Sequence, residues 1–149
     1  MKRILFAIVV LITFSSFSQN AKRLESYNLV KKVAIQGYDP VTYFKLKKAV
    51  LGKKEIYFNY EGVIYNFSST ENKETFIKTP AIYEPQYGGW CAYAMGSSGE
   101  KVDIDPETFK IIDNKLYLFY NAYFNNTLKS WNKDEKQLKT KADLNWKKI

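Results

Sequence analysis

The fold class is decided by the sequence EIYFNYEGVIYNF, residues 55–67. Aromatic and aliphatic residues dominate both of its halves, and Glu61-Gly62 separates them, so the stretch predicts two antiparallel strands joined by a tight turn. A second hairpin is predicted over residues 109–120, with its turn at Asp113-Asn114. Short helical patterns precede and follow each hairpin. The sequence therefore predicts a small α+β domain with two short antiparallel hairpins surrounded by short helices.

Capping signals place these helices. Asp39 before Pro40 predicts one helix start, and Ser68 with Glu71 forms a capping box that predicts another. Asn121 is expected to cap a later helix, whose apolar residues recur at helical spacing: Tyr123, Phe124, Leu128 and Trp131. A final helix is predicted from the spacing of Leu138, Ala142, Leu144 and Trp146.

The N-terminal residues suggest export. Residues 1–18 resemble a secretory signal peptide, because Lys2 and Arg3 precede an apolar run too short to span a membrane comfortably. Residues 19–32 are predicted to form an N-terminal arm or lead-in helix, and residues 33–149 the domain itself. We therefore expect a periplasmic or secreted protein without a stable transmembrane anchor.

Composition narrows the classes of function. The formal charge of +8 falls to +6 once Lys2 and Arg3 are removed, and the remaining lysines are scattered, with no nucleic-acid motif. Anionic surface polymers or lipid head groups are more plausible partners than nucleic acid. The alternative is that the lysines are simply solvated side chains on polar faces of the protein. Histidine is absent and no catalytic constellation is recognisable, so we expect a binding or accessory protein and not an enzyme.

The segment YGGWCAYAM, residues 87–95, holds the only cysteine, Cys91, together with Met95. The residues after the two glycines suit a short helix, on which a thiol and a thioether would lie one turn apart. Such a pair favours Cu(I), so copper is the expected cofactor if a metal is bound. Burial of both residues in the core, or a reactive or partner-linked thiol, are the alternatives.

Aromatic residues form a second candidate site. They are concentrated in the segments before and after the hairpin at residues 55–67. Such clusters are able to line a pocket for a small organic ligand, with Asp39 nearby. The alternative is that they are core residues whose hydroxyl groups have partners, and that Asp39 is only a helix cap. The candidate ligand-binding residues are Tyr38, Asp39, Tyr43, Tyr87, Trp90 and Tyr93.

Several of these motifs together resemble the YHS-domain family, in particular its longer, exported, stand-alone members. The resemblance rests on GYDPV at residues 37–41, YNFSS at 65–69, YGGWCAYA at 87–94, VDIDP at 102–106 and KADLNW at 141–146. It covers nearly all of the chain after residue 34. The family's short members are associated with metal-handling proteins, which implies metal binding through cysteines.

The sequence departs from that metal-binding pattern at each cysteine position. Thr42, Ser68 and Asn72 stand where the resemblance implies thiolates. A thiolate-rich site is therefore not available, and the fold is expected without that metal site. Three hypotheses remain: a soft-metal binder using Cys91, a small-ligand binder with a structural cysteine, and a thiol-dependent redox protein.

Overall fold

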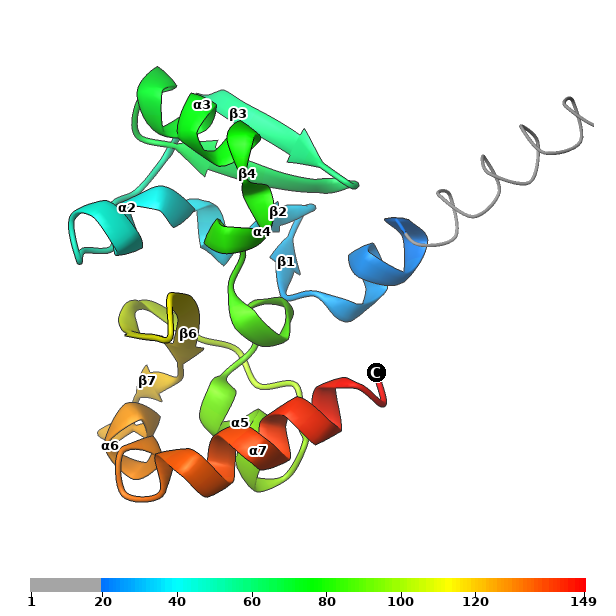
Figure 1. Ribbon diagram of the computed structural model, residues 1–149, viewed down its shortest axis with the longest axis vertical. Helices are drawn as coiled ribbons and strands as arrows, with labels where there is room; N and C mark the ends of the chain where they lie inside the picture. The colour runs from blue at the N-terminus through cyan, green and yellow to red at the C-terminus, as the bar shows by residue number, and fades with distance from the viewer. Residues whose placement is uncertain (1–19) are drawn as a thin grey trace, which may run out of the picture.

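The computed structural model describes residues 20–149. The expected signal peptide at residues 1–18 lies outside the described residues. The chain folds into an α+β domain with two lobes, and Figure 1 shows the strands and helices of the first lobe above those of the second. The lead-in segment is helical over residues 20–26 and then continues into the first strand.

The first lobe is built on a four-stranded sheet in the order β1-β2-β4-β3. The expected hairpin is confirmed: β3 and β4 pair antiparallel, with Phe58 opposite Tyr65. The lead-in segment adds the short strand β1, which pairs antiparallel with β2, and β2 pairs parallel with β4. The strands are β1 (Leu29–Val30), β2 (Val33–Ala34), β3 (Lys53–Tyr60) and β4 (Val63–Phe67).

Short helices pack around this sheet. Asp39 caps α2 as expected, because its side chain accepts a hydrogen bond from the Val41 N–H at 2.9 Å. The helices and turns of this part are η1 (Ile35–Gly37), α2 (Pro40–Lys45), α3 (Thr70–Lys78), α4 (Pro80–Tyr83) and η2 (Gln86–Gly89).

The predicted capping box at the start of α3 is wrong by one residue. Ser69 is the cap, and its hydroxyl accepts a hydrogen bond from the Asn72 N–H at 3.2 Å. Ser68 instead points to Asp39: its N–H and its hydroxyl donate to the Asp39 carboxylate, at 2.8 and 2.7 Å, and its hydroxyl oxygen accepts from the Asn72 side chain at 3.2 Å. Glu71 instead pairs with Lys45.

The second lobe contains the second expected hairpin, β5 (Asp105–Ile112) with β6 (Lys115–Phe119). Helices α5 (Ala92–Ser97) and α7 (Glu135–Trp146) pack closely on each other. A Cβ atom at Gly96 would lie 2.5 Å from the Leu138 carbonyl oxygen, so only glycine permits this approach. The predicted final helix is confirmed, because α7 contains Leu138, Ala142, Leu144 and Trp146.

The helix predicted from Asn121 is wrong at its beginning. Residues 121–126 form a small hairpin, β7 (Asn121–Ala122) with β8 (Asn125–Asn126), and the helix α6 starts only at Thr127 and ends at Trp131. Asn126 is the cap, and Tyr123 and Phe124 form the turn with φ of 50° and 64°. The helical spacing of the aromatic residues was misleading because two of them belong to this turn.

The core has two adjoining parts. Phe76 lies at the centre of the first, with its ring 4.7 Å from that of Tyr65 and 5.3 Å from that of Phe67. Trp131 lies in the second and packs on Tyr117 and Phe119. Among the helices of residues 20–149, none has the length and apolar character needed to cross a membrane.

Candidate functional site

Cys91 lies at the boundary between the two parts of the core. It immediately precedes α5, is fully buried, and packs with the first part, whereas Met95 packs with the second. Its Sγ atom accepts a hydrogen bond from the Tyr120 N–H at 3.3 Å and lies 3.4 Å from the Thr127 hydroxyl oxygen. Both of these residues belong to the base of the β7–β8 hairpin. The thiol therefore already has partners in the fold.

This geometry does not suit a copper site. A metal at Cys91 would have to displace the Tyr120 N–H from the sulfur and enter a fully buried position. No cluster of three or more cysteine, aspartate or glutamate side chains arranged to hold a metal is found within residues 20–149. Copper binding through Cys91 and Met95 remains a prediction of the sequence, and a structural role explains the contacts of Cys91 better.

Asp39 has a structural environment of the same kind. Its carboxylate is fully buried and accepts hydrogen bonds from Val41, Ser68 and Asn72. The Thr42 hydroxyl donates to the Asp39 carbonyl oxygen at 2.9 Å. The three residues found where the family resemblance implies cysteines, Thr42, Ser68 and Asn72, thus meet around one aspartate. Hydrogen bonds therefore hold these three side chains together.

The predicted aromatic site is not formed as one pocket. Tyr43 is fully buried and donates to the Pro106 carbonyl oxygen at 2.9 Å, and burial raises the pKa of its phenol. Tyr38 is half-buried beside Glu107. Tyr93 packs against both parts of the core. Among the predicted aromatic residues, only Tyr87 lines one of the hollows described next.

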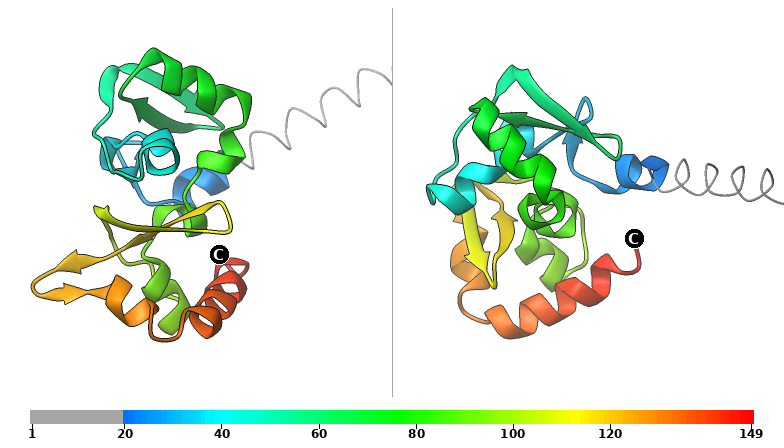
Figure 2. Two further views of the ribbon diagram at one scale, coloured as in Figure 1. Left: turned by 60° about the vertical axis from the view of Figure 1, so that its left-hand side comes forward. Right: turned by 45° about the horizontal axis from the view of Figure 1, so that its top comes forward.

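A concave surface lies between the lead-in helix and the end of α7, and we call it the Tyr27–Trp146 groove. It consists of two hollows of about 490 and 360 Å³ that share Tyr27, Trp146 and Lys147. Figure 2 (left) shows the C-terminal end of α7 close to the lead-in helix and η2. The first hollow is completed by Lys22, Arg23, Ser26, Glu61 and Ile149. The second is completed by Ala81, Glu84, Pro85, Gln86, Tyr87, Gly88, Lys115 and Asp143.

Gly88 is buried directly beneath two aromatic rings of the groove. The ring centroids of Tyr27 and Trp146 lie 6.0 Å apart, and a Cβ atom at Gly88 would come within 2.8 Å of each ring. Its φ of +59° also favours glycine, and its carbonyl oxygen accepts a hydrogen bond from the Asn28 N–H at 2.9 Å. Gly88 is therefore needed for the close approach of backbone and rings.

Arg23 and Glu84 hold Tyr27 in place. Arg23 donates from Nη2 to Glu84 Oε1 at 2.5 Å and from Nη1 to the Tyr27 hydroxyl oxygen at 2.9 Å. Tyr65 donates to the same Glu84 oxygen at 2.6 Å. Although burial opposes the charged guanidinium, the hydrogen bond and charge of Glu84 raise the pKa of Arg23. Burial and the Glu84 carboxylate raise the pKa of Tyr27 to about 12, so its phenol is neutral at pH 7.

Two hydrogen bonds fix the other side of the groove. The Trp90 Nε1–H donates to the Ser26 carbonyl oxygen at 2.7 Å and ties the lead-in helix to η2. The Tyr87 hydroxyl donates to Asp143 at 2.9 Å, and burial together with this bond raises the pKa of Tyr87. Two of the predicted residues therefore help to build the groove. Tyr87 lines it, whereas Trp90 does not line it but holds the lead-in helix in place.

The charge of the groove is distributed unevenly. Arg23 and Glu84 neutralise each other, whereas Lys22 and Lys147 make no ion pair within 4 Å in the part of the chain that is described. Sequence reasoning missed Tyr27, Arg23 and Trp146 as site residues. The only signal that pointed here was the double glycine, and it does not say which side chains approach it.

No family model, curated protein or solved structure matches this chain. The resemblance to the YHS-domain family thus stays a prediction from the sequence motifs.

Proposed function

We propose that the protein is an exported binding module that holds a small planar organic acid in the Tyr27–Trp146 groove, and that Cys91 serves the fold. Export rests on the sequence of residues 1–18. One observation carries the binding proposal: two aromatic rings, held in place against Gly88, line the first hollow beside two lysines that have no carboxylate partner within residues 20–149.

The two rings favour a flat ligand. Tyr27 and Trp146 pack so closely on the buried Gly88 that only glycine fits beneath them, and both rings line the first hollow as a fixed aromatic wall. Aromatic walls bind planar groups through apolar contact and ring stacking. The indole of Trp146 is half-buried and accessible from the groove.

The two unpaired lysines favour an acidic group on that ligand. Lys22 and Lys147 line the first hollow, whereas Arg23 is already paired with Glu61 and Glu84. A carboxylate or sulfonate at this position would be attracted by both lysines. A cationic ligand would be repelled.

Two fluorescent probes of one shape test the proposal. Anilinonaphthalene sulfonate is planar, aromatic and anionic, and phenylnaphthylamine is its uncharged counterpart. The sulfonate should bind saturably and more tightly than the uncharged probe. Lys22→Gln and Lys147→Gln should each weaken sulfonate binding roughly fivefold, a difference of about 1 kcal/mol typical of an exposed charge pair, and should leave the uncharged probe unaffected.

Lys148→Gln is the matched control, since Lys148 is the exposed neighbour of Lys147 and is absent from the lining of the groove. If all three variants bind the sulfonate equally, or if neither probe binds saturably, the proposal is wrong.

A further inference from the structure

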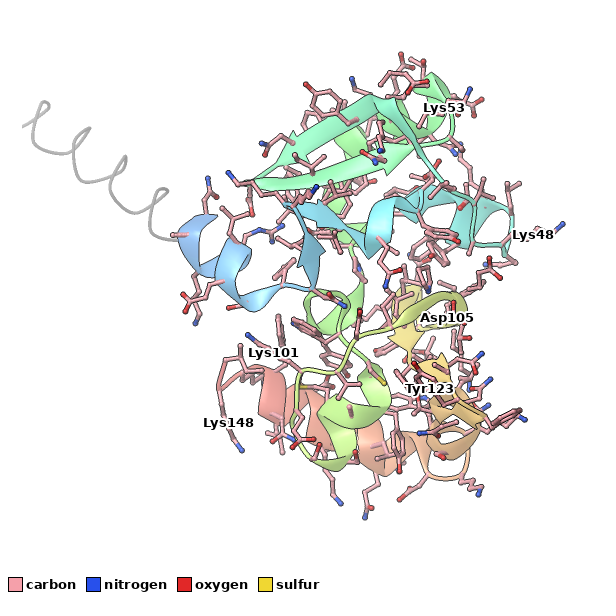
Figure 3. All side chains as sticks on the ribbon, turned by 180° about the vertical axis from the view of Figure 1, so that it is seen from behind. Lys48, Lys53, Lys101, Asp105, Tyr123 and Lys148 are labelled. Atoms are coloured by element: carbon pink, nitrogen blue, oxygen red, sulfur yellow. The ribbon has the colours of Figure 1, made fainter. Side chains whose placement is uncertain are left out.

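The turn between β7 and β8 exposes two large aromatic side chains. Tyr123 is 92% exposed and Phe124 is fully exposed, far more than any other large apolar residue described. Figure 2 (left) shows this hairpin projecting from the second lobe as a narrow arm, and Figure 3 labels Tyr123 on it. We call residues 121–126 the aromatic arm.

Folding does not explain aromatic residues at this turn. Both have positive φ, as in the two-residue turn that favours Asn-Gly, and side chains such as Tyr and Phe are strained there. Asparagines occupy positions 121, 125 and 126, but neither of the two turn positions. The solubility of the protein does not explain them either, because aromatic rings that are exposed to water do not favour it. Two exposed aromatic rings on strained backbone point to an interaction outside the chain.

The base of the arm is firmly attached to the domain. The Asn121 side chain donates to the Thr108 hydroxyl oxygen at 2.9 Å, and the Thr127 hydroxyl donates to the Tyr120 carbonyl oxygen at 2.9 Å. The Cys91 thiol accepts the Tyr120 N–H. These contacts give the buried cysteine a specific role, which is to fix the arm in its projecting position.

The size of the tip argues for the occupant. Two aromatic side chains offer roughly 300–500 Å² together, well below the roughly 800 Å² per partner of a stable protein interface. A bilayer interface needs no complementary pocket and accommodates Tyr and Phe rings at the level of the head groups. Residues 20–149 carry a formal charge of +6, the +8 of the whole chain without Lys2 and Arg3, which favours an anionic surface.

We propose that the aromatic arm is a membrane-docking element that inserts Tyr123 and Phe124 into the interface of an anionic lipid bilayer. The domain itself stays outside the bilayer. This inference is independent of the groove, because no residue of the arm lines it.

Vesicle sedimentation with the full chain tests this inference. The vesicles are made of phosphatidylcholine with phosphatidylglycerol. The variant Tyr123→Asn/Phe124→Gly supplies the favoured turn sequence and removes both rings. We expect it to bind at least tenfold more weakly than the natural chain. Tyr57→Asn is the control, since it removes an aromatic side chain that is 52% exposed on β3, and it should bind as the natural chain does.

A reporter at the tip separates the arm from the apolar run at residues 4–14, which is present in every variant. Phe124→Trp should show a blue-shifted emission on vesicles and be quenched by brominated lipid. Equal binding of the Asn-Gly variant and the natural chain, combined with an unquenched Trp at position 124, would overturn the proposal. Protection of that Trp only in a dimer or in a complex with another protein would also overturn it.

Discussion

Replacing Cys91 by alanine should destabilise the protein and loosen the base of the aromatic arm. The change removes a fully buried sulfur and leaves the half-buried Tyr120 N–H without its acceptor. An unsatisfied buried N–H costs about 1–2 kcal/mol, and the lost apolar contact and residual cavity add about 1–2 kcal/mol. We therefore expect a loss of about 2–4 kcal/mol in the free energy of unfolding.

Urea denaturation at equilibrium measures this loss. Ser97→Ala is the control, because Ser97 is exposed near the end of α5 and its hydroxyl makes only a long hydrogen bond, 3.4 Å, to Ala94. The natural thiol should react with a thiol reagent slowly in the folded protein and quickly in urea. Two results together would refute a structural role for the cysteine. The Cys91→Ala variant would be as stable as the natural protein, and the thiol of the natural protein would react at the rate of a free peptide.

Three further outcomes follow from the fold. First, Tyr123→Asn/Phe124→Gly should raise the free energy of unfolding by about 1–3 kcal/mol in urea titrations, because it relieves two strained left-handed residues; an unchanged or lower stability would contradict the turn geometry. Second, stability should decline as pH rises from about 10 to 12, since the pKa of Tyr27 is raised from 10.0 to about 12 and the unfolded phenol loses its proton first; the pKa values of Tyr43 and Tyr87 are raised too, so Tyr27→Phe should make this part of the urea-midpoint profile shallower, and an identical profile would contradict the assignment. Third, cysteines at the three positions around Asp39 should bind one Cd²⁺ with the ultraviolet absorbance of thiolate ligation, and a variant with one cysteine should not; the absence of that band would count against the proximity of Thr42, Ser68 and Asn72.

Local patterns in the sequence were sufficient for the two main hairpins. Residues 55–67 pair as expected because their turn and their strand-forming residues agree with each other. The cap at Asp39 was predictable for the same reason, since a short acidic side chain before Pro40 has few other local partners. The parallel pairing of β2 with β4 was not, because it joins segments that are far apart in the sequence.

The aromatic arm shows where spacing misleads. Tyr123, Phe124, Leu128 and Trp131 recur as on a helix, yet the first two form a turn. Only Leu128 and Trp131 lie on a helix. The asparagines at positions 121, 125 and 126 were the competing signal, since they favour turns and caps over a helix interior.

The candidate site was the part least accessible from sequence. Most of the aromatic residues proposed for a pocket satisfy their hydroxyl groups inside the fold, as Tyr43 does with Pro106. The groove instead joins Tyr27, from the predicted lead-in segment, with Trp146, from the predicted final helix. Nothing local in either segment indicates that these two rings meet over Gly88.

The three indole N–H groups provide the most direct test of the central claim. In a proton–nitrogen NMR titration with anilinonaphthalene sulfonate, the Trp146 indole signal should shift saturably, because its ring lines the groove. The Trp131 signal should stay unchanged, because that ring is fully buried in the second part of the core. A Trp146 signal that does not move, or that moves no more than that of Trp131, would contradict a binding site in the Tyr27–Trp146 groove.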